Sequence, residues 1–224
     1  IWRGYRSERF LKLDHLSLIA ELIEPEYQDK VSKRVNNRLR HAKLIGCPQS
    51  LDDCVDSGSR EYLPTGITSV LSSLAFVPDG LNICILGPSD SGKTHLANCI
   101  SHELINTGHS VVYMTPFELF SVMKREAFSK NIYPRADYLR LFSCDLLIID
   151  DLGTEMTNSM TLAELFELLN ERINSKKSTL ISTNLDLAGI KDIYTERLFS
   201  RIMEFYTLVP LIGRDIRIQK KIGG

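Results

Sequence analysis

The sequence has no long hydrophobic run and no large excess of charge of either sign. No apolar segment approaches the roughly 18 residues that a membrane-spanning helix needs, and the formal net charge of the 224 residues is −1. None of the five cysteines forms a C-x-x-C pair, and the five histidines show no metal-ligand spacing with acids or cysteines. These absences argue against a membrane span, a zinc-ribbon site and nucleic-acid binding through overall charge. We expect one cytoplasmic domain, with at most a small appendage and no membrane contact.

One motif organises the chain, and it reads Gly-Pro-Ser-Asp-Ser-Gly-Lys-Thr over residues 87–94. This is the pattern G-x-x-x-x-G-K-T of the phosphate-binding loop of nucleoside triphosphatases. The apolar run 81–86 predicts a buried strand before the loop, and helical spacing in 95–105 predicts a helix after it. Such a loop points backbone N–H groups at phosphate oxygens, and the helix N-terminus adds its positive end. We predict that nucleotide is bound by Gly87, Pro88, Ser89, Asp90, Ser91, Gly92, Lys93, Thr94 and His95.

Carboxylates follow a second apolar run. Residues 145–151 read Asp-Leu-Leu-Ile-Ile-Asp-Asp, which is typical of a strand buried on both faces of a parallel sheet. Its last acids then lie at the carboxyl end, where open α/β sheets bind ligands. Asp150 and the hydroxyl of Thr94 are expected to hold Mg²⁺. Asp151 is expected to polarise the attacking water, with Glu155 as the second candidate.

The other expected catalytic groups are an amine and an amide. Lys93 supplies a mobile positive charge to the β- and γ-phosphates. The β-rich segment 179–182 leads into Asn184, whose amide would stand beside the γ-phosphate. An asparagine at a strand end is also a common turn residue, so this position is less specific than the loop.

Strands alternate with helices along the chain, which predicts an α/β three-layer sandwich with a parallel central sheet. The order of parts is that of ATPases that insert a strand between their two nucleotide motifs. The expected strands are 81–86, 110–114, 145–151, 179–182, 206–210 and 215–218; the expected helices of this region are 67–76, 95–105, 116–127, 138–142, 160–173 and 196–202.

The N-terminal part has a different character. Apolar spacing predicts helices over 11–23 and 26–44, and the second carries Lys and Arg on its outer faces. That basic face is either an ordinary solvated surface or a contact for DNA phosphates or an acidic partner. Residues 46–66 are rich in loop-forming residues and acids. We therefore divide the chain into a helical N-terminal extension, residues 1–50, and an ATPase core, residues 51–224.

The end of the helix expected over 116–127 interleaves aromatic and basic residues. This pattern is typical of surfaces that hold single-stranded nucleic acid, and also of a half-buried helix face with solvated ends. The residues concerned are Phe120, Lys124, Arg125, Phe128 and Lys130.

Four strings carry a specific resemblance. They are residues 87–94, Leu-Ile-Ile-Asp-Asp-Leu-Gly-Thr-Glu at 147–155, Ser-Thr-Asn-Leu at 182–185 and Glu-Arg-Leu-Phe-Ser-Arg-Ile at 196–202. Together they resemble the DnaC/DnaI helicase loaders, AAA+ proteins whose relatives include the IstB transposition helpers. The resemblance implies ATP as the nucleotide and an ATP-dependent homo-oligomer. The loaders lack the C-terminal helical lid of other AAA+ proteins, and we expect no lid here.

The resemblance also implies roles for single residues. Asn184 matches the sensor-1 position. Arg201 matches the arginine finger that reaches the γ-phosphate bound by a neighbouring subunit, with Arg197 as the near alternative. Arg217 matches a C-terminal arginine that the loaders use as a sensor-2-like contact.

Three functions follow as hypotheses. The favoured one is an ATP-hydrolysing loader that helps to place a DnaB-type replicative helicase on DNA, with single-stranded DNA as the expected form. The alternative is an IstB-like ATPase that assembles on DNA and recruits a transposase, because the basic region 27–44 resembles those helpers. A scaffold that binds nucleotide with little hydrolysis is disfavoured, because the expected catalytic residues are all present.

Overall fold

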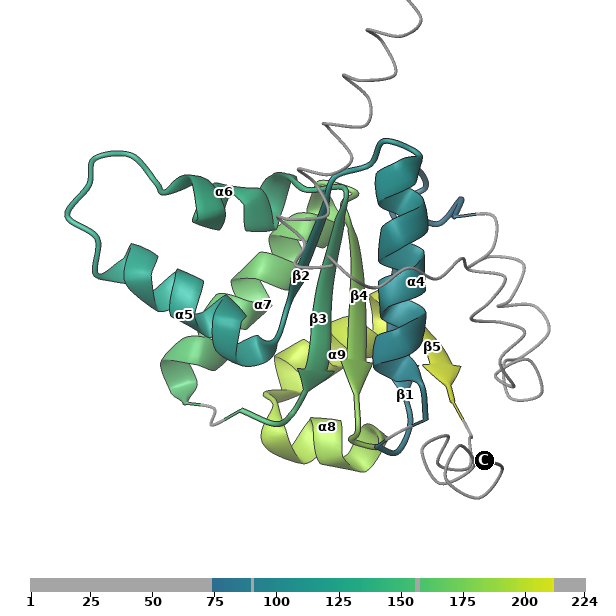
Figure 1. Ribbon diagram of the computed structural model, residues 1–224. Coiled ribbons are helices and arrows are strands. Elements are labelled where there is room, and N and C mark those ends of the chain that lie inside the picture. Colours follow the sequence, from purple (N-terminus) through teal and green to yellow (C-terminus); the bar gives the residue numbers. More distant parts are fainter. Residues whose placement is uncertain (1–73, 90, 156–157, 212–224) are drawn as a thin grey trace, which may run out of the picture.

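Five strands and six helices are seen in the computed structural model, which describes residues 74–89, 91–155 and 158–211 (Figure 1). The strands are β1 (Asn82–Leu86), β2 (Val111–Met114), β3 (Leu146–Leu152), β4 (Ser178–Thr183) and β5 (Tyr206–Pro210). The helices are α4 (Lys93–Asn106), α5 (Pro116–Ala127), α6 (Ala136–Ser143), α7 (Ser159–Asn174), α8 (Leu187–Ile193) and α9 (Glu196–Phe205). All strands join one parallel sheet in the order β2-β3-β4-β1-β5. β4 thus lies between β1, which leads into the phosphate loop, and β3, which carries the acids.

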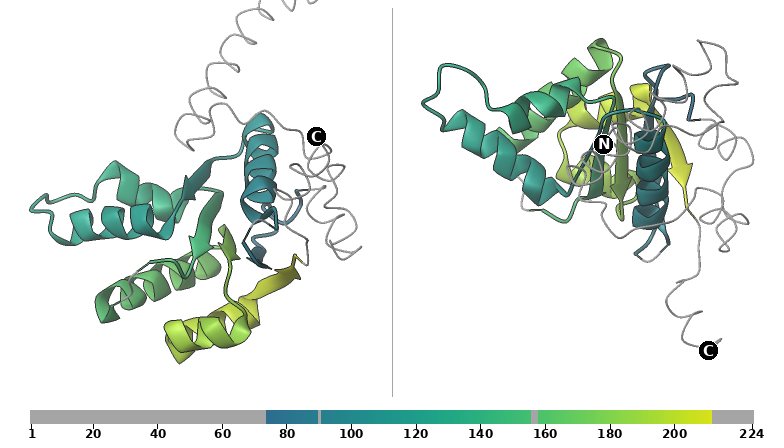
Figure 2. Two further views of the ribbon diagram at one scale, coloured as in Figure 1. Left: turned by 60° about the horizontal axis from the view of Figure 1, so that its bottom comes forward. Right: turned by 45° about the horizontal axis from the view of Figure 1, so that its top comes forward.

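The sheet is covered on both faces, and the strand sequences show why. Side chains alternate along a strand, so a strand buried on both faces must be apolar at every position. In β3, Leu146 and Ile148 pack in the cluster that includes α4. Leu147 and Ile149 pack in the opposite cluster, with α5, α6, α7 and α9. Figure 2 shows α4 on one side of the sheet and these helices on the other, which confirms the predicted three-layer sandwich.

Local sequence signals set several helix starts. The Thr115 side chain accepts a hydrogen bond from the Glu118 N–H, and the Glu118 carboxylate accepts one from the Thr115 N–H, with Pro116 at the first helical position. Asn158 begins α7 through a similar reciprocal pair with Thr161. These caps place α5 and α7 with the starts that the sequence predicts to within one residue.

Two parts of the fold differ from the prediction. The helix expected over 67–76 is wrong where it can be checked, because residues 75–80 form turns that end at Gly80 with φ 68°. The Phe76 side chain is fully buried in the core and holds this turn segment in place. Helix α8 was not predicted, because it is short and contains Gly189; Asp186 caps it by accepting the Gly189 N–H. Three predictions concern residues that the structure does not describe. They are the helical N-terminal extension 1–50, the strand at 215–218 and the absence of a C-terminal helical lid.

A buried arginine ties three elements together near the amino ends of the strands. Arg172 of α7 is fully buried. Its guanidinium donates to the Leu141 carbonyl at 2.6 Å, the Cys144 carbonyl at 3.2 Å and the Ser178 carbonyl at 2.5 Å. The Thr179 hydroxyl accepts a further bond at 3.0 Å. Because these acceptors belong to α6, its C-terminal end and β4, the guanidinium acts as a polar clamp between helix layer and sheet.

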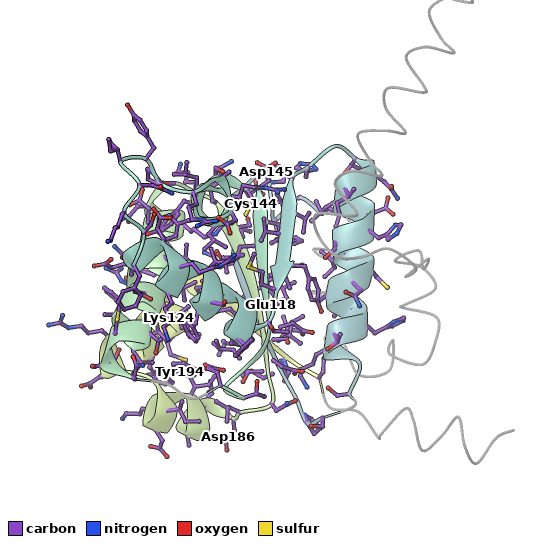
Figure 3. The ribbon with its side chains drawn as sticks, turned by 60° about the vertical axis from the view of Figure 1, so that its left-hand side comes forward. Glu118, Lys124, Cys144, Asp145, Asp186 and Tyr194 are labelled. Carbon is purple, nitrogen blue, oxygen red and sulfur yellow. The ribbon has the colours of Figure 1, made fainter. Side chains whose placement is uncertain are left out.

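An ion pair closes the same end of the sheet. Asp145 accepts hydrogen bonds from the Ser110 N–H at 2.9 Å and hydroxyl at 2.7 Å, and it pairs with Lys177 at 2.9 Å. Figure 3 shows Asp145 and Cys144 at the opposite end of the molecule from Tyr194 and Asp186. Burial opposes ionisation of Asp145, but the Ser110 and Lys177 contacts outweigh it and lower its pKa to about 2.

Among the described residues, no helix combines the length and the apolar character that a membrane span requires.

Replacing Asp145 with Asn should lower the free energy of unfolding by about 1–2 kcal/mol at pH 7, after a discount for the partial exposure of the ion pair. Because the folded-state pKa lies below the usual 3.8, this stabilisation is complete above 3.8 and is lost as the pH falls toward 2. Chemical denaturation of both proteins across this range measures the difference. In a matched control, Asp137→Asn removes an exposed carboxylate paired with Arg125 and should cost less. A difference for Asp145→Asn that does not change with pH would contradict the assignment.

Candidate nucleotide site

The phosphate loop leaves β1 at Gly87, where only glycine fits. A Cβ atom there would lie 2.6 Å from the Leu211 carbonyl oxygen and 2.9 Å from the Ser91 hydroxyl. The Gly87 N–H donates to the Thr183 carbonyl at 3.2 Å, which ties the loop to the end of β4. Gly92 has φ 90°, a left-handed conformation that lets the loop turn into α4 without a Cβ clash. Both loop glycines therefore have a steric reason to be glycine.

Lys93, the first residue of α4, is almost fully buried, with 4% of its surface exposed. Its ammonium donates to the Gly87 carbonyl at 2.9 Å, the Pro88 carbonyl at 2.7 Å and the Asn184 Oδ1 at 2.6 Å. The lysine and the asparagine were predicted from motifs 91 positions apart in the chain. The structure brings them into direct contact.

Asp150 is the most heavily hydrogen-bonded acid of the site, and it is 5% exposed. Its Oδ2 accepts the Thr94 hydroxyl at 2.9 Å and the Tyr113 hydroxyl at 2.6 Å. Its Oδ1 accepts the Ser182 hydroxyl. The Thr94 and Asp150 pair expected for Mg²⁺ is therefore assembled, one oxygen from α4 and the other from β3.

Asp151 follows in an unusual backbone conformation, with φ 63°. A left-handed conformation is uncommon for a residue other than glycine and is often found at functional sites. The Asn184 amide donates to Asp151 Oδ1 at 3.5 Å, so Asn184 bridges Lys93 and Asp151. Burial and the adjacent Asp150 raise the pKa of Asp151, while Lys93 opposes the shift. A carboxylate with a raised pKa is a better proton acceptor for a water molecule than an ordinary surface aspartate.

Glu155 is held by other groups. Its carboxylate accepts the Gly153 N–H at 2.9 Å and the Tyr194 hydroxyl from the end of α8. Burial and the bond to Glu155 raise the pKa of Tyr194, so the phenol stays protonated and remains a donor. Of the two candidates for orienting water, Asp151 is the one that shares a hydrogen-bond partner with Lys93.

The two candidate finger arginines lie on α9. Arg197 is exposed and Arg201 is half-buried, with its guanidinium 5.2 Å from the centre of the Phe205 ring. Both line a surface hollow together with Ser200. Within the described part of the chain, no recorded contact joins either arginine to residues 87–94. A finger that acts on a neighbouring subunit would need such an outward position.

The other predicted residues have simple positions. Pro88, Ser89 and Thr94 are exposed at the mouth of the loop, and His95 is half-buried in the first turn of α4. Asp90 and Arg217 lie outside the described residues.

The residues present fit a nucleoside phosphate with Mg²⁺. The Ser91 hydroxyl is buried and has no hydrogen-bond partner within the described ranges. α4 starts without a capping side chain from the described residues, and the positive end of its helix dipole lies at the phosphate loop. Those residues hold no cluster of three or more His, Cys, Asp or Glu that would bind a metal by itself. Mg²⁺ typically binds one or two carboxylates plus phosphate oxygens, which Asp150 and Thr94 match.

Sequence reasoning missed two hydroxyls, those of Tyr113 and Ser182. Tyr113 sits in β2, which was predicted only as a strand, and Ser182 was noticed only as part of the string before Asn184. Polar side chains in strands next to an acid-bearing strand were the available signal.

The sheet order, the glycine loop and the acids at the end of β3 define a nucleotide-binding fold of the P-loop type. Sequence comparison extends this: the model of the family described as IstB-like ATP binding protein matches residues 8–222. The chain belongs to this IstB-like ATP-binding family.

Individual relatives fall into two groups. An insertion-sequence ATP-binding protein of Sinorhizobium fredii is 28% identical over 211 residues, covering 92% of this chain and 84% of the relative. The IS21 ATP-binding protein of Pseudomonas aeruginosa is 24% identical over 217 residues, covering 94% and 79%. The replicative helicase loader DnaC of Buchnera aphidicola is 33% identical over 117 residues, covering 52% and 48%.

Solved structures support the same fold. The DnaC helicase loader aligns with a TM-score of 0.55 and 23% identity, covering 64% of this chain and 88% of that one. AMPPCP-bound DnaA from Aquifex aeolicus aligns with a TM-score of 0.62 and 22% identity, covering 78% and 54%. The predicted resemblance to IstB/DnaC-type AAA+ proteins is confirmed at the level of family and fold.

Replacing Asp151 with Asn should slow ATP hydrolysis by about 100-fold or more, because an amide cannot accept a proton from water. Glu155→Gln is the matched comparison and should slow hydrolysis far less, since Gln can still accept the Gly153 N–H. Single-turnover hydrolysis and nucleotide affinity are measured for both variants, and affinity should change little in either. A larger loss of hydrolysis in Glu155→Gln than in Asp151→Asn would assign the water to Glu155.

Proposed function

We propose that this protein is an ATP-hydrolysing helper of DNA transposition that assembles on DNA and acts with a transposase. The observation that carries the ATPase assignment is the contact network of Lys93, Asn184, Asp151, Asp150 and Thr94. These five side chains come from the loop end of α4 and the carboxyl ends of β3 and β4. The assignment to transposition rests on the insertion-sequence relatives, which match nearly the whole chain and most of their own length.

Each residue has a chemical role in this proposal. The loop N–H groups and Lys93 bind the phosphates, and Thr94 with Asp150 would hold Mg²⁺. Bound Mg²⁺ neutralises charge that develops on the phosphate oxygens. Asp151 orients the attacking water and accepts its proton. Asn184 forms hydrogen bonds with both Asp151 and Lys93 and so fixes their positions relative to each other.

The proposal includes assembly of several copies. Arg201 is the candidate for supplying positive charge to a γ-phosphate bound by the next subunit, and Arg197 is its near neighbour on the same helix. Their positions at a surface hollow of α9 support this role. A lone subunit would then bind ATP but hydrolyse it slowly, so hydrolysis reports assembly.

The segment between α5 and α6 supports contact with DNA. Figure 1 shows this connection extending away from the body of the domain. It exposes large apolar side chains, with Phe128 at 72%, Ile132 at 91% and Tyr133 at 80%. The exposed cations Lys124 and Arg125 lie in the last turn of α5, just before Phe128, and Arg125 is paired with Asp137. Phe120 is buried, so it does not belong to this exposed aromatic and basic set. Exposed aromatic rings next to cations suit stacking on unpaired bases, so single-stranded DNA is the form to test first.

Loading of a replicative helicase is the second candidate function. It is favoured by the Ser-Thr-Asn-Leu and Phe-Ser-Arg-Ile strings and by the match to DnaC over about half of this chain. The two candidates share the ATPase site and differ in the protein partner.

A co-purification experiment separates the two functions. Tagged protein is incubated with DNA and ATP, and then separately with an IS21-type transposase and with a DnaB-type helicase. Retention of the transposase in ATP, with no retention of the helicase, is the expected result. Stable retention of the helicase alone would contradict the transposition proposal and support the loader.

Replacing Arg201 with Ala should leave ATP binding by the isolated subunit unchanged and reduce assembly-stimulated hydrolysis by about 100-fold or more. Arg197→Ala is the matched control, one helical turn away, and should retain most of the stimulation. Hydrolysis is measured against protein concentration with DNA present. Full stimulation in Arg201→Ala, with loss in Arg197→Ala, would transfer the finger role to Arg197.

A further inference from the structure

β3 carries one residue more than β4 at the position of the acids. The ladder pairs Ile149 with Ile181 and then Leu152 with Thr183, so two residues of β3 oppose Ser182 alone. This two-against-one arrangement is a β-bulge. Its effect is visible in the packing, because Leu152 joins the same core cluster as Ile149, three positions away. In a regular strand, residues three apart point to opposite faces.

The bulge explains how two consecutive acids serve one site. In a regular strand, the side chain of Asp151 would point away from the face on which Asp150 meets Thr94. The left-handed turn at Asp151, with φ 63°, instead leaves its carboxylate within reach of Asn184. Both carboxylates are therefore directed to the loop end of the sheet.

The Ser182 hydroxyl bonds to both bulged residues. The hydroxyl oxygen accepts a hydrogen bond from the Asp151 N–H at 2.9 Å, and the hydroxyl donates a hydrogen bond to Asp150 Oδ1. Ser182 is fully buried, so solvent water does not compete for either hydrogen bond. A bulge leaves a backbone group without its ladder partner, and a buried unpaired N–H destabilises the fold. The hydroxyl supplies that partner and fixes the carboxylate at once.

A second hydroxyl reaches Asp150 from the other neighbouring strand. Tyr113 of β2 donates to Asp150 Oδ2 at 2.6 Å, the same atom that accepts the Thr94 hydroxyl at 2.9 Å. Asp150 is therefore held from β2 on one side and from β4 on the other. Hydrogen bonds of this kind fix the direction in which a carboxylate presents its lone pairs to a metal.

We infer that Ser182 and Tyr113 are positioning residues of the nucleotide site. Ser182 maintains the bulge that directs Asp150 and Asp151 to one site, and Tyr113 orients the Asp150 carboxylate for Mg²⁺. The inference rests on the proposed ATPase function for its consequences, but the bulge itself is tested without nucleotide.

The experiment compares Ser182→Ala and Tyr113→Phe with a matched control, Ser101→Ala. Ser101 is also fully buried, and its hydroxyl donates at 2.7 Å to Ala97 within α4, away from the acids. The first readout is amide hydrogen exchange at Asp151 in the nucleotide-free protein. The second is binding of a fluorescent ATP analogue, in EDTA and then in a Mg²⁺ titration.

Ser182→Ala should raise exchange at Asp151 by about 10-fold or more, because the N–H loses its acceptor. In both Ser182→Ala and Tyr113→Phe, the Mg²⁺ concentration that gives half of the maximal change in binding of the ATP analogue should rise by about 10-fold. Binding of the analogue in EDTA should stay unchanged. Tyr113→Phe should leave Asp151 exchange as in wild type, and Ser101→Ala should change neither readout.

The outcomes are separable. Wild-type exchange at Asp151 in Ser182→Ala, or an unchanged Mg²⁺ requirement in both variants, overturns the inference and leaves the proposed function intact. Absence of ATP turnover in the wild-type protein with DNA and partner contradicts the proposed function, whereas the exchange difference still supports Ser182. If Ser182→Ala fails to fold, the Mg²⁺ titration of Tyr113→Phe decides.

Discussion

The adjacency of β1, β4 and β3 is the constraint on which the site depends. Because the three strands are parallel, their carboxyl ends meet at one edge, and the segments that follow them converge there. That edge receives the phosphate loop after β1, Asn184 after β4 and the acids that end β3. The contact between Lys93 and Asn184 at 2.6 Å exists only because β4 lies next to β1. A different strand order would separate the loop from its partners.

The two ends of the sheet serve different purposes. At the amino ends of the strands, Arg172 forms hydrogen bonds and Asp145 forms an ion pair. These contacts join the sheet to the helices and connecting segments. At the carboxyl ends, Asp151 has a left-handed backbone and a raised pKa, and Ser91 has a buried hydroxyl with no partner among the described residues. An uncommon backbone conformation and an unpaired buried hydroxyl are thus found where the nucleotide is expected.

Much of this fold was predictable, and the reasons are local. β3 could be located because both its faces are buried, which makes Leu146 to Ile149 apolar without interruption. Lys93, Thr94 and Asp150 could be named because the loop pattern and the apolar strand each specify a position. The bulge opposite Ser182 and the Tyr113 bond could not be predicted, because both depend on cross-strand register. The turns at 75–80 follow from the burial of Phe76 against a distant strand, which no local pattern encodes.

We propose that residues 87–94 and Asp150 bind ATP together with Mg²⁺. Calorimetric titration of ATP with Mg²⁺ into wild-type protein and Lys93→Ala tests it most directly, with the exposed Lys191→Ala on α8 as the control. We expect Lys93→Ala to weaken binding by about 30-fold or more, because a charge-assisted contact to phosphate is lost, while Lys191→Ala binds as wild type. Equal ATP affinity in all three proteins would show that Lys93 does not bind the phosphates.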